Sequence, residues 1–122
     1  MTGDRTDGAP DAREVLDAAL HAWQIHGETC HVESAADRVP GLFASLAALE
    51  SRCIEFVIER ELGAEGWGAL SRWPRSNSWQ LRALVPQSLL GQAHEYLREG
   101  DFELQGWWVE NGQVFFRSVE IA

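Results

Sequence analysis

The sequence predicts an α+β domain in which a central apolar helix is packed by other helices and by a small antiparallel sheet that includes a C-terminal β-hairpin. Three observations support this prediction. Apolar residues recur at three- and four-residue steps through residues 40–62, as on a helix. Apolar and polar residues alternate from Trp79 to Val85, as in a half-buried strand. Near the end, Asn111-Gly112, the preferred pair for a type I′ turn, separates two apolar runs.

The central helix is expected from Pro40 to Leu62. Pro40 suits the first helical position, and Gly63 suits the residue just past the end. The apolar positions cover about half of the helix circumference, which is more than a surface helix shows. They are Leu42, Phe43, Leu46, Ala47, Leu49, Cys53, Ile54, Phe56, Val57 and Ile58. A helix this apolar must be covered by other elements, so we place it at the centre of the domain.

The remaining chain divides into residues 1–9, a flexible acidic leader, and residues 10–122, a single α+β domain. The other expected elements are an amphipathic helix from Pro10 to Gly27, a strand or loop from Thr29 to Glu33, a short helical turn ending near Trp73, and a helix from Pro86 to Glu99. There are no internal repeats and no linker that would divide the domain.

The composition is acidic. The 122 residues include 19 Asp and Glu against ten basic residues, all of them Arg, and the formal net charge is −9. A net negative charge of this size opposes nucleic-acid binding and favours a basic partner. Solubility alone is an alternative explanation for the acidic composition. The first residues do not resemble a secretory signal, no apolar run approaches the ~20 residues that span a bilayer, and the two cysteines form no framework, so a cytoplasmic protein is expected.

The C-terminal hairpin is apolar on both faces near its tip. The Asn111-Gly112 turn implies a register in which the expected core face pairs Trp108 with Phe115, Leu104 with Val119, and Phe102 with Ile121. The other face pairs Val109 with Val114 and Trp107 with Phe116. Either another element or a dimer mate covers this second face, or it is an exposed patch that marks a binding site.

A second candidate surface is the stretch from Gly66 to His94, which contains no acidic residue. It interleaves three tryptophans with three arginines, the residue types that protein-interface hot spots and stacking platforms use: Trp67, Trp73, Trp79, Arg72, Arg75 and Arg82. In the alternative interpretation, the tryptophans fill the core and the arginines neutralise nearby acids.

Residues with metal-ligand chemistry are few. The one grouping is His21, His26, Cys30, His31 and Cys53. Gly27 interrupts any helix there and no Cys-x-x-Cys is present, so we expect neither a metal nor another cofactor. Fragments at His31-Val32-Glu33 and His94-Glu95 lack the partners that a zinc deaminase or zinc protease requires. No residue is therefore assigned a catalytic role.

These patterns favour a small acidic module that binds another macromolecule, with a protein preferred, of inhibitor, immunity or adaptor type. The expected partner is a basic protein or a second copy of the chain; a membrane is not expected, and nucleic acid is disfavoured. The expected contact residues are Trp107, Phe116, Val109, Val114, Trp67, Trp73, Trp79, Arg72, Arg75 and Arg82.

Two alternatives stay open. The first is a small enzyme or ligand-binding domain with a Trp-lined pocket, in which Glu50, Glu61 or a histidine acts as acid or base. Both glutamates fall in the apolar sector of the expected helix and are expected at its edge. The second is a winged-helix nucleic-acid binder, which the order of helix and hairpin suggests, but the hairpin has Glu110 at its tip and Arg117 as its one basic residue.

Overall fold

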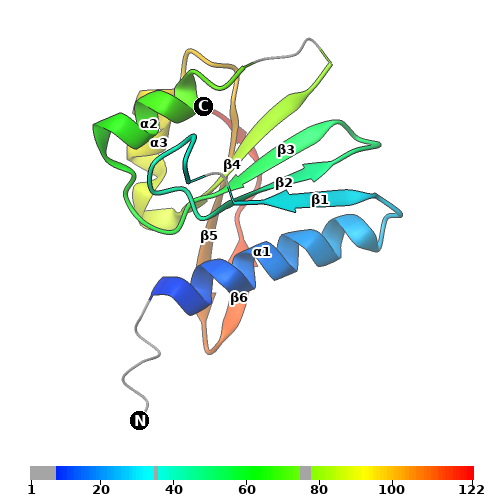
Figure 1. The fold of residues 1–122 in the computed structure, drawn as a ribbon. Helices are drawn as coiled ribbons and strands as arrows, with labels where there is room; N and C mark the ends of the chain where they lie inside the picture. Colours follow the sequence, from blue (N-terminus) through cyan, green and yellow to red (C-terminus); the bar gives the residue numbers. More distant parts are fainter. Residues whose placement is uncertain (1–7, 35, 75–77) are drawn as a thin grey trace.

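The computed structural model describes residues 8–34, 36–74 and 78–122. These residues form a seven-stranded mixed sheet, curled into a half-barrel, with three α-helices around it (Figure 1). Most of the expected leader, residues 1–7, lies outside the described residues. No helix among the described ranges is long and apolar enough to cross a membrane.

The elements follow one another along the chain in a simple order. They are α1 (Gly8–Gln24), β1 (Cys30–Glu33), β2 (Ala44–Ala48), β3 (Cys53–Val57), α2 (Gly63–Ser71), β4 (Gln80–Pro86), the short 3-10 helix η2 (Gln87–Leu89), α3 (Leu90–Leu97), β5 (Glu103–Glu110), β6 (Gln113–Phe116) and β7 (Glu120–Ile121).

The sheet combines an antiparallel half with a parallel centre. Strands β1, β2 and β3 are antiparallel neighbours, β3, β4 and β5 are parallel, and both β6 and β7 pair antiparallel with β5. Parallel neighbours need a crossover connection, which α2 supplies between β3 and β4, and α3 between β4 and β5. Helices α2 and α3 pack side by side, whereas α1 lies across the sheet away from them (Figure 1).

Each face of the sheet has its own hydrophobic cluster. Under α1, the buried strand residues are Ala44, Leu46, Val57, Leu84 and Trp107, which pack with Val15, Leu16 and Ala19 of the helix. On the opposite face, Phe56, Leu81, Ala83, Val85 and Leu104 pack with Trp67 and Leu70 of α2 and with Ala93 and Leu97 of α3. Because both faces are covered, the central strands are apolar on both sides.

The predicted fold class is wrong, because the expected central helix does not exist. Residues 44–48 and 53–57 are neighbouring antiparallel strands, joined by a turn in which Arg52 has a φ of 56°. Strands covered on both faces read as continuous apolar runs, and such runs also satisfy three- and four-residue spacing. The protein is therefore organised around a sheet, and the helices cover it.

Most other expected elements are confirmed. The first helix, the strand after Trp79 and the helix after Pro86 lie within a few residues of their predicted bounds. The stretch from Thr29 to Glu33, which the sequence left open, contains the edge strand β1. Gly63, expected to end a helix, instead begins α2 with a φ of 76°.

The hairpin register is confirmed at the tip and wrong at the base. Trp107 lies opposite Phe116, and Asn111 and Gly112 both have positive φ, as a type I′ turn requires. Further down, Leu104 lies opposite Glu120 instead of Val119, so one extra residue is accommodated between β6 and β7. The expected core face at the tip is also wrong, since α1 covers the face of Trp107.

Candidate functional site

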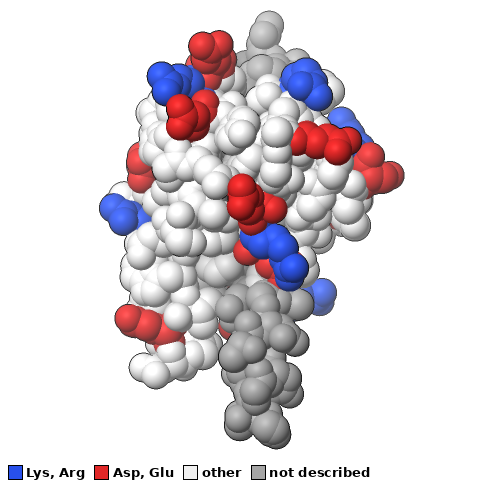
Figure 2. Space-filling model, turned by 90° about the vertical axis from the view of Figure 1, so that its left-hand side faces the viewer, with Lys and Arg blue, Asp and Glu red and all other residues white. Residues whose placement is uncertain are grey.

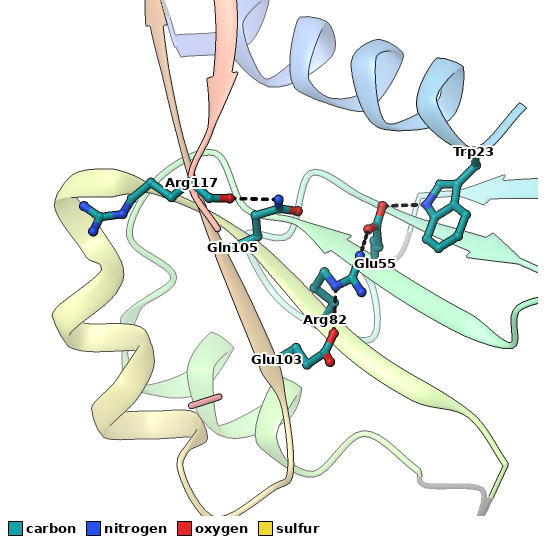
Figure 3. Close-up of polar contacts among 6 residues, drawn as sticks. All are labelled: Trp23, Glu55, Arg82, Glu103, Gln105 and Arg117. Atoms are coloured by element: carbon teal, nitrogen blue, oxygen red, sulfur yellow. Dashed lines mark hydrogen bonds and ion pairs between the residues drawn. The ribbon is translucent and has the colours of Figure 1, made fainter. Parts of the chain in front are cut away.

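A row of three charged side chains crosses the sheet on the face that α1 covers. Glu55 of β3 pairs in register with Arg82 of β4, which pairs with Glu103 of β5. Arg82 donates from Nη1 to Glu55 Oε2 over 2.8 Å and from Nε to Glu103 Oε1 over 2.9 Å (Figure 3). The side chains of Glu55, Arg82 and Glu103 are 4%, 19% and 17% exposed. The row is a largely buried ion triad.

Helix α1 closes one end of this row. Trp23, in the last turn of α1, donates from Nε1 to Glu55 Oε1 over 2.9 Å, so both oxygens of Glu55 accept a hydrogen bond (Figure 3). Burial raises the pKa of Glu55, and the hydrogen bonds from Trp23 and Arg82 oppose that rise. For Arg82, burial alone would lower the pKa, but the neighbouring Cys53, Glu103 and Glu55 raise it overall.

A pocket of about 320 Å³ opens at Glu55 and Arg82 of this row, between the second half of α1 and the sheet. Its lining combines aromatic, aliphatic and charged residues: Ala19, Ala22, Trp23, His26, Glu55, Arg82, Leu84, Gln105 and Phe116. Sites for small molecules are commonly about 300–1,000 Å³, mostly apolar, with a few placed polar groups. The pocket has that composition and lies at the lower end of that size range.

Two polar side chains of the lining keep hydrogen-bonding capacity. Gln105 donates from Nε2 to the carbonyl oxygen of Arg117 over 2.9 Å, which leaves its Oε1 as an acceptor (Figure 3). His26 Nδ1 lies 3.0 Å from the carbonyl oxygen of Ala22. A carbonyl oxygen can only accept, so Nδ1 must carry the proton of this hydrogen bond, and in the neutral ring Nε2 is then an acceptor. The lining therefore offers two neutral acceptors beside the ion triad.

The residues expected at the hairpin tip are gathered under α1. Trp107 is 5% exposed and donates from Nε1 to the carbonyl oxygen of Leu84 over 3.3 Å. Val109, Val114 and Phe116 pack, partly buried, against the same cluster. Of the two alternatives for this face, coverage by the protein itself is what the structure has. Phe116 is the one residue of this set that lines the pocket.

The Trp–Arg stretch does not form one surface. Trp67 is fully buried, donates to Gln92 and stacks on Tyr96, so it belongs to the core between α2 and α3. Trp73 is half-buried, with the Arg38 guanidinium 3.8 Å from its ring centroid and Phe56 at its edge.

The other members of this set are scattered. Trp79 is half-buried, Arg72 is exposed, and Arg75 lies outside the described residues. Among the described members of the set, Arg82 alone lines the pocket, where it neutralises acids as the alternative interpretation expected.

On the side of the molecule drawn in Figure 2, acidic and basic side chains are interspersed. Glu50 is exposed and binds Thr29, and Glu61 is exposed and accepts a hydrogen bond from Gln92. The expectation that both glutamates lie at the surface is confirmed, and neither lines the pocket.

The cysteines and histidines do not converge. Cys30 lies opposite Ala48, which lies opposite Cys53, so the two thiols are two strands apart and both are free. Burial raises the pKa of Cys53 to about 12. Within the described part of the chain, no group of three or more His, Cys, Asp or Glu residues is placed to hold a metal ion.

Sequence reasoning missed Glu55, Glu103, Gln105 and the role of Trp23. Glu55 interrupts an apolar run, which is a signal, but on a helix it falls on the solvated face beside Glu59. Only the parallel pairing of β3, β4 and β5 brings Glu55, Arg82 and Glu103 together. Comparison with protein-family models, curated proteins and solved structures gives no match, so function is inferred from the pocket itself.

Proposed function

We propose that this chain is a small ligand-binding domain whose binding site is the pocket between α1 and the sheet. The observation that carries the proposal is the ion triad, of which Glu55 and Arg82 line a pocket with aromatic walls. Elsewhere under α1 the sheet presents apolar side chains such as Leu46, Val57 and Leu84. Burying ions costs free energy that apolar residues of similar size do not cost, so a buried triad is a poor choice for stability alone.

Binding fits the pocket better than acid–base catalysis does. Both oxygens of Glu55 already accept hydrogen bonds, from Trp23 and Arg82, which hold it as a fixed charge. Of the acid–base candidates that the sequence suggested, Glu50 and Glu61 lie outside the lining, and a histidine, His26, lies in it. Fixed charges and aromatic walls orient a ligand, and this is the property that supports a binding domain.

A bulky side chain placed at an exposed lining residue would fill the pocket and leave the core unchanged. Ala22 is an exposed residue of α1 that lines the pocket, and Gln24 is an exposed residue of the same helix outside the lining. Thermal denaturation would be measured with a library of small molecules for the wild type, Ala22→Trp and Gln24→Trp. We expect ligands that raise the Tm of the wild type and of Gln24→Trp, but not of Ala22→Trp. A stabilising effect that survives in Ala22→Trp, or no stabilising ligand at all, would contradict the proposal.

Protein binding is the second proposal, and one observation favours it. β1 is the terminal strand of the described sheet, and Val32 on it is 40% exposed. Such an edge accepts an added strand from a partner, and the net charge of −9 favours a basic one, whether the chain acts as an inhibitor, an immunity protein or an adaptor. A homodimer through the same edge is the alternative partner.

Nuclear magnetic resonance titration with Arg-rich peptides tests this second proposal. We expect amide shifts at residues 30–33. Shifts confined to the pocket, or none, would remove it. A cytoplasmic location is also proposed, and the two free thiols support it.

A further inference from the structure

The ion triad, which contributes Glu55 and Arg82 to the pocket lining, carries more negative than positive charge. The triad sets two carboxylates against one guanidinium, so with every group ionised it contributes a net charge of −1. Arg82 donates to Glu103 through Oε1 alone, and among the described residues Glu103 has no other hydrogen-bond partner, so Oε2 remains an acceptor. The positive charge of Arg82 is therefore already compensated on both sides.

Two further carboxylates, Glu28 and Glu50, lie near Cys30 at one end of the sheet. Glu28 binds the backbone and hydroxyl of Ser51, and Glu50 binds Thr29 in the same way, which fixes both carboxylates at this end of the sheet. Burial is the main cause of the raised pKa of Cys30, and Glu28, Glu50 and Glu55 raise it further.

The other nearby arginine does not offset this charge. Arg117 contributes its carbonyl oxygen to Gln105, but its guanidinium extends away from the triad and donates to Gln87 (Figure 3). Within the described lining, Arg82 is thus the sole arginine, and it is paired. The net negative charge of the triad would therefore repel an anionic ligand.

The walls of the pocket favour the same class of ligand. Trp23 and Phe116 line it, and both are partly buried aromatic rings. A cation over an aromatic face gains about 0.5–2 kcal/mol, more when the site is desolvated. The neutral acceptors Gln105 Oε1 and His26 Nε2 suit a ligand that carries several N–H donors.

Resting on the proposed function, we infer that the ligand of this pocket is an organic cation of the guanidinium, amidinium or ammonium class. Its aromatic or aliphatic body lies between Trp23 and Phe116, and its charged head lies against the Glu55–Arg82–Glu103 row. The cation belongs either to a free small molecule or to the side chain of an arginine or lysine in a protein.

Three ligands of nearly equal shape test the charge. Benzamidine is a cation, benzamide is neutral and benzoate is an anion. Calorimetric titration of the full chain is expected to give a Kd for benzamidine about tenfold or more below that for benzamide, with benzoate weakest. The benzamidine Kd should also rise with added salt, whereas the benzamide Kd should not.

A matched pair of variants places the effect at the triad. Glu103→Gln keeps the shape of the side chain and makes the triad neutral, so benzamidine should bind several-fold more weakly while benzamide is unchanged. Glu33→Gln removes an exposed acid on β1 that belongs neither to the triad nor to the lining, and should leave both affinities as in the wild type. Equal loss in both variants would mean that only the overall charge acts, and would overturn the inference.

The failures of the two proposals are distinguishable. If benzamide or benzoate binds as tightly as benzamidine and the binding is lost in Ala22→Trp, the pocket binds ligands but the cation class is wrong. If no arm binds but the library yields a stabilising ligand that Ala22→Trp loses, the cation class alone is wrong. If the library yields none, the proposed function fails as well. The peptide acetyl-Gly-Arg-Gly-amide gives the source: binding as tight as that of benzamidine supports a protein side chain, and weaker binding supports a free small molecule.

Discussion

Removing the charge of Arg82 should lower the free energy of unfolding, because the carboxylates of Glu55 and Glu103 then stay buried without a compensating charge. Arg82→Met keeps the length and much of the volume of the side chain and deletes both charged hydrogen bonds. Glu55, with a side chain only 4% exposed, would then keep one partner, Trp23. The variant therefore leaves a buried carboxylate with no compensating charge.

The size of the loss follows from the burial of the three partners. Breaking a buried ion pair from one side costs about 3–5 kcal/mol, and Arg82 itself is 19% exposed, which places the loss near 3 kcal/mol. An ordinary domain has about 5–15 kcal/mol of stability, so the variant should still fold. With a urea m value of about 1–3 kcal/mol/M, the midpoint should fall by about 1–3 M.

The loss should also depend on pH, with a defined sign. Without Arg82, the pKa of Glu55 in the folded state lies even further above its unfolded value. The folded state then holds the proton to higher pH, so stability is lost as pH rises through the window between the two values. The deficit of Arg82→Met should be larger at pH 7 than at pH 5, and the further change Glu55→Gln should recover part of it at pH 7.

Urea unfolding followed by circular dichroism measures both effects. Arg13→Met is the matched control, because it breaks an exposed ion pair with Asp17 whose side chains are 69% and 61% exposed. Its cost should be within about 0.5 kcal/mol. A loss below about 1 kcal/mol for Arg82→Met, or an equal loss at both pH values, would refute the triad as a buried, compensated unit.

Three further predictions concern other parts of the fold. Gly66→Ala in α2 should destabilise the protein, because the new Cβ would lie 2.5 Å from the carbonyl oxygen of Pro40. In Gly91→Ala of α3 the new Cβ meets nothing within 4 Å, so this variant should be more stable than the wild type by up to about 1 kcal/mol. Thermal melts that rank the two variants the other way would contradict the packing. Hydrogen bonds from Thr29 lower the pKa of the exposed Glu50. Glu50→Gln should therefore be less stable than the wild type at pH 7, and this difference in stability should vanish as pH falls through the lowered pKa. A difference that persists at pH 2 in urea titrations would be inconsistent with this. Cys53, buried and with a pKa of about 12, should resist iodoacetamide at pH 8 until the protein unfolds; rapid labelling of the native protein, detected by mass spectrometry, would show that this part of the sheet opens.

Elements with local signals were predictable from the sequence. The amphipathic α1 has a helical period, and the Asn111-Gly112 turn fixes the tip of its hairpin by backbone conformation alone. The hairpin base was not predictable, because the extra residue between β6 and β7 has no turn signal of its own.

The sequence predicts a helix where the structure has strands β2 and β3, and the reason is physical. The segment from Ala44 to Ala48 is rich in Ala and Leu, which favour helices in isolation, and tertiary burial on both faces overrides that preference. The polar turn Glu50-Ser51-Arg52 was the available signal for a hairpin.

The candidate site depends on that same sheet. Glu55, Arg82 and Glu103 are separated by 27 and 21 residues, and parallel pairing across two crossovers brings them together. No local pattern encodes such a register, so the sequence predicts Arg82 as a contact residue but does not predict its partners.

A crystal structure of the full chain grown with benzamidine tests the cation site most directly. We expect the benzamidine ring between Trp23 and Phe116, with amidinium nitrogens within hydrogen-bonding distance of the Glu55 or Glu103 carboxylate. Benzamidine bound elsewhere, or a pocket closed by the side chains of Trp23 and Phe116 with no ligand inside, would contradict the assignment of this pocket as an organic-cation site.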